Sequence, residues 1–150
     1  MTTKNLNSLQ SSRGFTLIEI MVVMVILGLL VAVVAPNIMG RSDQAKVTVA
    51  ETQLTNISKA LDIYRLDNSH YPSTQQGLDA LKSRPSGSPE PKNWSPDGYM
   101  KSIPEDPWGN EFQYVSPGTE GAYDLYSYGS DGREGGDGDA ADISIWTIGN

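Results

Sequence analysis

The acidic residues near the C-terminus are the side chains whose type and spacing come closest to a binding chemistry. Within the stretch SDGREGGDGDAAD, where Arg133 is the one base, the acids are Asp131, Glu134, Asp137, Asp139 and Asp142. Carboxylate and carbonyl oxygens on a flexible loop are the ligands that Ca²⁺ takes in proteins. The stretch is not an EF-hand, because Arg133 occupies the third position of the motif. Composition alone leaves two possibilities open, a calcium site and a solvated acidic turn without an ion.

A second candidate is the carboxylate inside the apolar N-terminal segment. Residues 15–35 form an apolar run of 21 residues, and Glu19 alone interrupts it with a charge. As a helix this run measures about 31 Å, which matches a hydrocarbon core of roughly 30 Å. We therefore predict a transmembrane helix over residues 15–36. Because Lys4 and Arg13 precede the run, the positive-inside rule predicts a cytoplasmic N-terminus.

Glu19 is costly in such a segment unless its charge is compensated. A carboxylate near the bilayer centre costs on the order of 2.5–3.5 kcal/mol, and less near a helix end that reaches the interface. Cleavage after Gly14 would create an α-amino group at Phe15, one helical turn from Glu19. A buried ammonium and a buried carboxylate offset much of each other's cost when they meet. The pair could form between subunits or within one, and a tolerated interfacial acid remains a third possibility.

The first element that must position these groups is a long helix. Apolar residues recur in steps of three and four over residues 47–64, which predicts an amphipathic helix whose apolar stripe covers a small domain. The helix should end near Asp67 and Asn68, well before Pro72. If it continues the membrane segment, one helix runs from Phe15 to Asp67, and Pro36 should bend or loosen it.

The remaining chain predicts a short helix and a small sheet. The helix is expected to begin at Ser73 and to end before Pro85, and residues 85–98 should form an extended loop because they are rich in proline and glycine. Strand composition recurs at residues 111–115, 123–129 and 143–148, with glycine-rich turns between them. Together these elements indicate an α+β fold, a long N-terminal helix packed on an antiparallel sheet of about three strands.

Composition and motifs argue against several classes of function. The chain has no cysteine, which excludes a disulfide framework, a thiol nucleophile and a Cys-ligated metal. Its net charge of −7, without a basic cluster, argues against a nucleic-acid partner. The single histidine, His70, is expected to be a solvated or capping residue rather than a catalytic one. We therefore expect a protein that is not an enzyme, in which the tryptophans anchor the core and loops.

The stretch RGFTLIEIMVVMVILGLL resembles the class III signal of type IV pilin-like proteins. The resemblance implies that residues 1–14 are a leader, which a prepilin peptidase removes by cutting between Gly14 and Phe15. It also implies that the new amine of Phe15 is methylated, and that Glu19 pairs with the N-terminus of a neighbouring subunit during assembly. A conventional secretory signal is the competing interpretation, but its apolar region would be only about 7 to 15 residues long.

Three further segments narrow the resemblance to the major pseudopilins of type II secretion systems: YPSTQQGLDAL, PEDPWGNEFQY and YDLYSYGSDGREGGDGDAADISIW. The resemblance implies a pilin-like fold, a periplasmic domain over residues 37–150, and one structural Ca²⁺ in the loop 128–144. Asp131 and Asp139 match best as side-chain ligands, Asp142 and Asp137 are further candidates, and the carbonyl of Tyr128 is a backbone ligand. Type IV major pilins usually carry a C-terminal disulfide loop, which the absence of cysteine excludes here.

The function that this resemblance implies is structural. The subunit would sit in the inner membrane, in contact with lipid, before it polymerises into a helical periplasmic pseudopilus that helps drive folded proteins across the outer membrane. The implied partners are other copies of the chain, minor pseudopilins, an inner-membrane assembly platform and the prepilin peptidase. The alternatives are the major pilin of a surface type IV filament and a monomeric, membrane-anchored calcium-binding domain.

Overall fold

The computed structural model describes residues 14–148, and within this range the side chains of residues 33–41 and of Asp139 lie outside the described part. The leader predicted for residues 1–14 therefore lies outside it, apart from Gly14. The chain divides into two compact units, Met1–Met39 and Gly40–Asn150, and each is described by itself.

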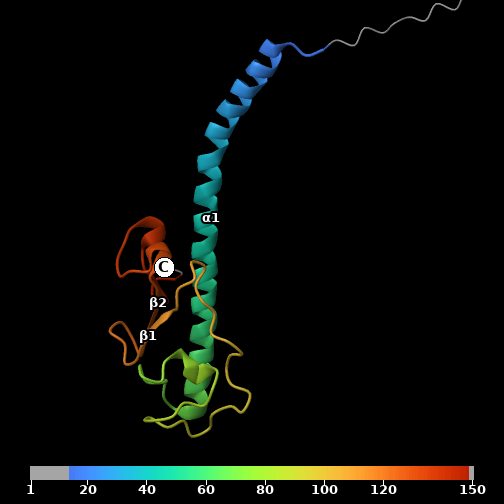
Figure 1. Cartoon of the computed structure of the whole chain (residues 1–150). Helices are drawn as coiled ribbons and strands as arrows, with labels where there is room; N and C mark the ends of the chain where they lie inside the picture. Colours follow the sequence, from blue (N-terminus) through green and yellow to red (C-terminus); the bar gives the residue numbers. More distant parts are fainter. Residues whose placement is uncertain (1–13, 149–150) are drawn as a thin grey trace, which may run out of the picture. The chain divides into compact units, whose positions relative to one another are not determined.

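The main element is the helix α1, Leu17–Asn68, as the sequence predicts (Figure 1). Its backbone is helical through position 36, while the bend expected at Pro36 stays a prediction. The helix ends where Ser69 adopts a φ of 68°, the left-handed conformation that closes many helices. The amide of Ser69 still donates to the carbonyl of Arg65 at 2.7 Å, which adds one backbone hydrogen bond to the last turn of the helix.

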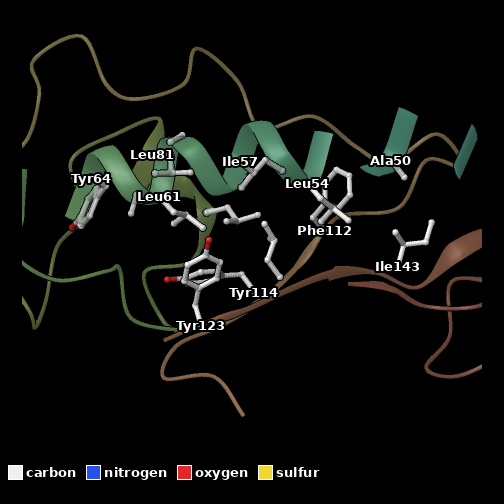
Figure 2. Close-up of a cluster of buried hydrophobic side chains, with 14 residues drawn as sticks. Ala50, Leu54, Ile57, Leu61, Tyr64, Leu81, Phe112, Tyr114, Tyr123 and Ile143 are labelled. Carbon is white, nitrogen blue, oxygen red and sulfur yellow. The ribbon is translucent and has the colours of Figure 1, made fainter. Parts of the chain in front are cut away.

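The core of the second unit forms along the predicted apolar stripe of α1. Leu54, Ile57, Leu61 and Tyr64 are fully buried, and Figure 2 shows them in order along the helix. The side chains that cover the stripe come from later in the chain, and they are Leu78, Leu81, Phe112, Tyr114, Tyr123, Leu125 and Ile143. The 3.6-residue period of the sequence thus sets which face of the helix is buried.

The sheet is antiparallel with the order β1-β2-β3, which confirms the α+β fold. Its strands are β1 (Gln113–Val115), β2 (Asp124–Ser127) and β3 (Ile143–Ser144). In the register Tyr114 lies opposite Leu125, and Ser127 opposite Ile143. The strand predicted over residues 143–148 is wrong in its extent. The amide and hydroxyl of Thr147 donate to the carbonyl of Ser144 at 3.1 and 2.9 Å, which turns the chain away from the sheet.

The helix predicted between Ser73 and Pro85 is reduced to the 3₁₀ helix η1, Leu78–Leu81. Gly77 precedes it with a φ of 59°, a left-handed conformation that a continuous helix cannot contain. The loop 85–98 has no helix or strand, as expected. Trp94 anchors this loop, because its indole N–H donates to the carbonyl of Ala80 at 2.9 Å.

His70 differs from the expectation of a solvated residue. It is half-buried, and its ring meets the ring of Tyr64 edge-on with 6.0 Å between centroids. Its Nδ1 lies 3.0 Å from the carbonyl of Tyr71, while Nε2 is buried with no hydrogen-bond partner among the described residues. The ring therefore packs against the end of the core instead of facing water.

Candidate functional site

The predicted cleavage site lies in exposed chain just ahead of α1. The helix begins at Leu17, so the bond between Gly14 and Phe15 is outside any regular element. Phe15 is 77% exposed, and a side chain added at Gly14 would meet nothing within 4 Å. A peptide bond in exposed, uncrowded backbone outside a helix or strand is the kind that a peptidase can bind.

Glu19 forms a reciprocal contact with Thr16 at the start of α1. The amide of Thr16 lies 3.4 Å from Glu19 Oε2, and the amide of Glu19 lies 3.3 Å from Thr16 Oγ1. This is a capping box, in which two amides that a helix end leaves unpaired are satisfied by side chains. The T-x-x-E spacing is its signature, and it could have been read from the sequence. In the uncut chain Glu19 therefore stabilises the beginning of its own helix.

Apart from Thr16 and Glu19, the described side chains of the first unit are apolar, and they are exposed. They include Leu17 at 79%, Ile18 at 70% and Val31 at 65%. Within the residues that the structure describes, no helix combines the length and the hydropathy needed to cross a membrane. The transmembrane segment predicted for residues 15–36 stays a prediction.

The acidic loop contains two short 3₁₀ helices, η2 (Gly129–Asp131) and η3 (Gly138–Ala140). They pack against each other, which brings together the backbones that carry Asp131 and Asp139. The chain between them passes very close to itself, because a side chain at Gly136 would collide with the carbonyl of Ala140. The loop thus folds back so that its first and second acidic segments are neighbours.

The described acids of the loop are only partly engaged by the protein. Asp131 Oδ1 accepts the amide of Arg133 at 3.0 Å, and Asp142 Oδ2 accepts the amide of Gly135 at 3.0 Å. Asp137 is exposed and precedes η3 without a side-chain cap. The side chain of Asp139 lies outside the described residues. Asp131 and Asp142 each keep a second carboxylate oxygen for which the described part of the chain shows no hydrogen bond.

The negative charge of this loop acts on the neighbouring sheet. The pKa of Tyr126 is raised to about 12, first by its interaction with the Tyr128 hydroxyl and by burial, and further by the charges of Glu134 and Asp142. The rings of Tyr126 and Tyr128 also meet edge-on, with 5.3 Å between centroids. A cation bound in the loop would offset the effect that the charges of Glu134 and Asp142 have on the pKa of Tyr126.

The residues fit calcium by the chemistry of their donors. All the candidate ligands are carboxylate or carbonyl oxygens, which Ca²⁺ prefers, and the two 3₁₀ helices place the best-matched pair on adjoining turns. Among the described residues alone, no three acids lie close enough together to hold a metal. Backbone carbonyls and Asp139 would therefore have to complete the coordination.

Sequence reasoning missed a buried polar group beneath this loop. Asp106 is only 4% exposed and bonds to Ser127, a fully buried residue at the end of β2. The signal in the sequence was the run Asp-Pro-Trp-Gly-Asn, since Asp before a proline and a glycine indicates a turn held by the aspartate side chain.

Comparison with known proteins places this geometry in a family. Residues 37–146 match the family model "Type II secretion system (T2SS), protein G", and residues 9–35 match the prokaryotic N-terminal methylation motif. The type II secretion system core protein G of Pseudomonas aeruginosa is 62% identical over 133 residues, covering 89% of this chain and 94% of that protein. The protein of the same name from Vibrio cholerae is 48% identical over 143 residues, covering 95% of this chain and 97% of that one.

A solved structure agrees with the sequence comparisons. The crystal structure of the major pseudopilin from the type 2 secretion system of enterohaemorrhagic Escherichia coli superimposes with a TM-score of 0.67 at 42% identity, covering 75% of this chain and 96% of that one. The likeness thus extends over both the sequence and the pilin-like arrangement of helix and sheet. The chain belongs to the protein G family of type II secretion systems.

Proposed function

We propose that the chain is the major pseudopilin of a type II secretion system, a structural subunit without catalytic activity. The observation that carries the proposal is the match to the protein G family over residues 37–146, joined to a methylation motif over residues 9–35. Copies of the chain polymerise into a helical pseudopilus, which acts with minor pseudopilins and an inner-membrane assembly platform. Growth of this filament helps to drive folded proteins across the outer membrane.

Before assembly the subunit lies in the inner membrane. Residues 15–36 span the bilayer, the N-terminus is cytoplasmic and the domain from residue 37 onward is periplasmic. The apolar composition of residues 15–35 and the basic residues Lys4 and Arg13 ahead of them support this topology. A prepilin peptidase removes residues 1–14, and the exposure of the Gly14–Phe15 bond supports its access.

Glu19 then pairs with the methylated amine of Phe15 on a neighbouring subunit. A carboxylate and an ammonium in an apolar surrounding attract each other strongly and define register better than apolar side chains, which can slide. The capping box shows that Glu19 is already oriented toward the first turn of the helix. Cleavage creates the new positive charge at the residue just before this turn.

The acidic loop binds one structural Ca²⁺. Asp131 and Asp139 are the best candidates for side-chain ligands, Asp142 and Asp137 are further ones, and the carbonyl of Tyr128 contributes from the backbone. The ion supplies positive charge that neutralises the clustered carboxylates, which lets the loop pack against the sheet. The contact between η2 and η3 supports this assignment.

The first test is the intact mass of the protein recovered from membranes of a host that has the cognate peptidase. The proposal expects the loss of residues 1–14 and the gain of one methyl group. An uncleaved chain would contradict it, because Phe15 would then have no free amine for Glu19 to bind.

The second test compares Glu19→Ala with Glu19→Gln in a filament assembly assay in cells. Glutamine retains the side-chain oxygen of the capping box but removes the charge. If Glu19 acts by pairing with an amine, both variants block assembly while the monomer still accumulates in the membrane. Normal assembly of Glu19→Gln would show that the helix cap, and not the charge pair, is what assembly requires.

A further inference from the structure

The backbone of Gly129, the first residue of η2, is held on both sides of its Cα. Its amide donates to Ser127 Oγ at 3.1 Å, and its carbonyl accepts the side-chain amide of Asn110 at 3.4 Å. Gly129 is buried and has a φ of 68°, so the chain enters the acidic loop in a conformation that glycine favours. Two side chains from different segments thus fix where the loop begins.

Asp106 holds both of these residues, Ser127 by its side chain and Asn110 by its backbone. Ser127 Oγ donates to Asp106 Oδ2 at 2.6 Å, and the backbone amide of Asn110 donates to Asp106 Oδ1 at 2.8 Å. The amide of Asp106 in turn donates to the carbonyl of Asn110 at 2.8 Å. We name Asp106, Asn110 and Ser127 the loop clamp, since one buried carboxylate connects the two contacts to Gly129.

The chemistry of the clamp residues decides which group donates and which accepts in each hydrogen bond. An ionised carboxylate only accepts hydrogen bonds, so the one hydroxyl proton of Ser127 goes to Asp106. The oxygen of Ser127 is then left with lone pairs for the amide of Gly129. Hydrogen bonds to a charged group are stronger than neutral ones, and Asp106 and Ser127 are both buried.

The clamp lies directly beneath the residues proposed to bind calcium. Tyr128 is the residue before Gly129, and Asp131 ends the same turn. A side chain added at Gly132 would meet Asn110 Oδ1 at 3.1 Å, so Asn110 fills the space under this turn as well. Because the Tyr128 carbonyl shares a peptide plane with the Gly129 amide, holding that amide fixes the direction of the carbonyl. The bond to the Gly129 carbonyl helps to fix the position of Asp131 in the same turn.

We infer that Asp106 is a positioning residue for calcium binding, which acts through Ser127 and Asn110 and touches no ion itself. The inference rests on the calcium site of the proposed function. A loop whose first turn is already set loses less conformational freedom when it binds, and this raises its affinity. If the clamp served only the stability of the fold, its loss would leave the affinity of the folded protein unchanged.

The experiment measures calcium affinity by titration calorimetry with CaCl₂, on the full chain in detergent and below its unfolding temperature. Ser127→Ala removes the connection from Asp106 to the amide of Gly129, which runs through the Ser127 hydroxyl, and keeps the Asp106 bonds to the backbone amides of Trp108 and Asn110. We expect it to weaken calcium binding about tenfold, the effect of roughly one hydrogen bond. Asp106→Asn should act in the same direction. If its oxygen keeps the amides of Trp108 and Asn110, its NH₂ group faces Ser127 and cannot accept the hydroxyl proton.

Asn68→Ala is the matched control. Asn68 is also a buried polar residue that holds a loop, but its partners are Tyr64, Asn93 and Tyr99, away from the clamp. It should keep the calcium affinity of the wild type. A second measurement, exchange of the Gly129 amide hydrogen in chelator, should be faster in Ser127→Ala than in this control.

The outcomes separate the two proposals. If the wild type binds calcium and Ser127→Ala binds it equally well, the positioning role of Asp106 is overturned while the calcium site stands. If the wild type binds no calcium, the calcium site itself is overturned and the inference falls with it. Weakened binding in Ser127→Ala, with faster exchange at Gly129 and an unaffected control, supports both.

Discussion

Asn68, the last residue of α1, donates a side-chain hydrogen bond to the hydroxyl of Tyr99 at 3.0 Å. The same amide also donates to the carbonyl of Tyr64 at 3.0 Å, and its oxygen accepts the amide of Asn93 at 2.9 Å. Asn68 is 1% exposed, so its side chain relies on these bonds and not on water. The loop that contains Asn93 and Tyr99 is therefore tied to the end of the helix by one side chain.

Replacing Asn68 with alanine should destabilise the protein. The change leaves a carbonyl, an amide and a hydroxyl with fewer partners in a buried place, and we expect a loss of about 2 kcal/mol in the free energy of unfolding. Urea unfolding of the full chain in detergent measures it. Asn56→Ala, at an exposed position of the same helix, is the control and should change stability by less than about 0.5 kcal/mol. Equal effects of the two variants would contradict the role given to Asn68.

The apolar stripe of α1 provides a second prediction. Leu54 is fully buried in the core, so Leu54→Ala should cost about 2–5 kcal/mol through lost burial and the cavity left behind. Leu66 lies on the same helix but is 82% exposed, and Leu66→Ala should leave the stability of the isolated subunit nearly unchanged. Denaturant unfolding of both variants checks the contrast. A large loss in Leu66→Ala alone would mean that the buried face has been assigned wrongly.

Calcium should raise the unfolding temperature of the domain. At a free calcium concentration one hundredfold above Kd, binding to the folded state alone adds about 2.7 kcal/mol. Asp131→Ala should abolish the difference between melts in calcium and in chelator. Glu134→Gln, which removes an acid of the same loop that is not among the proposed ligands, should retain most of it. A wild type that melts at the same temperature in both conditions would exclude a structural calcium ion.

Asp124 should contribute a pH dependence to stability. The amide of Thr119, the Thr119 hydroxyl and the amide of Glu120 hydrogen-bond to its carboxylate, and together they hold the pKa of Asp124 below its ordinary 3.8 against the opposing effect of burial. Because the pKa is lower in the folded state, this stabilisation is present above pH 3.8 and is lost as the pH falls through the folded-state pKa.

Unfolding curves recorded between about pH 6 and pH 3 test this dependence. Asp124→Asn should be less stable than the wild type at the upper end and should lose less stability on acidification. Asp79→Asn is the control, since Asp79 forms an exposed ion pair with Lys82 that contributes little. If both variants follow the wild-type curve, the turn at Thr119 does not depend on the charge of Asp124.

The helix and its buried face could be predicted from the sequence because both follow from a local period. Leu54, Ile57, Leu61 and Tyr64 repeat at helical spacing, and burial of one side of a helix requires nothing else. The ends of the strands could not be predicted from the sequence, because each end is set by one or two hydrogen bonds and not by a repeating pattern. The third strand stops where Thr147 bonds back to Ser144, and its sequence would equally suit a longer strand.

Of the candidate sites, too, some features could be predicted from the sequence and others could not. The cleavage junction and the acidic loop are contiguous in sequence, so their residue types were visible at once. The bond between Ser127 and Asp106 joins residues 21 positions apart, and an aspartate in a proline- and glycine-containing turn resembles any solvated turn. Only the fold shows that this carboxylate is buried and that the acidic loop begins above it.

The continuous helix has a mechanical consequence for the second unit. The buried apolar side chains of α1 are spread along its axis from Ala50 to Tyr64, and they form one core cluster with residues of the sheet and its neighbouring segments. A pull along the helix axis would load these contacts in shear, so that several must yield together, whereas a force at right angles would peel them apart one by one. The domain is therefore built to resist tension along α1 better than sideways force.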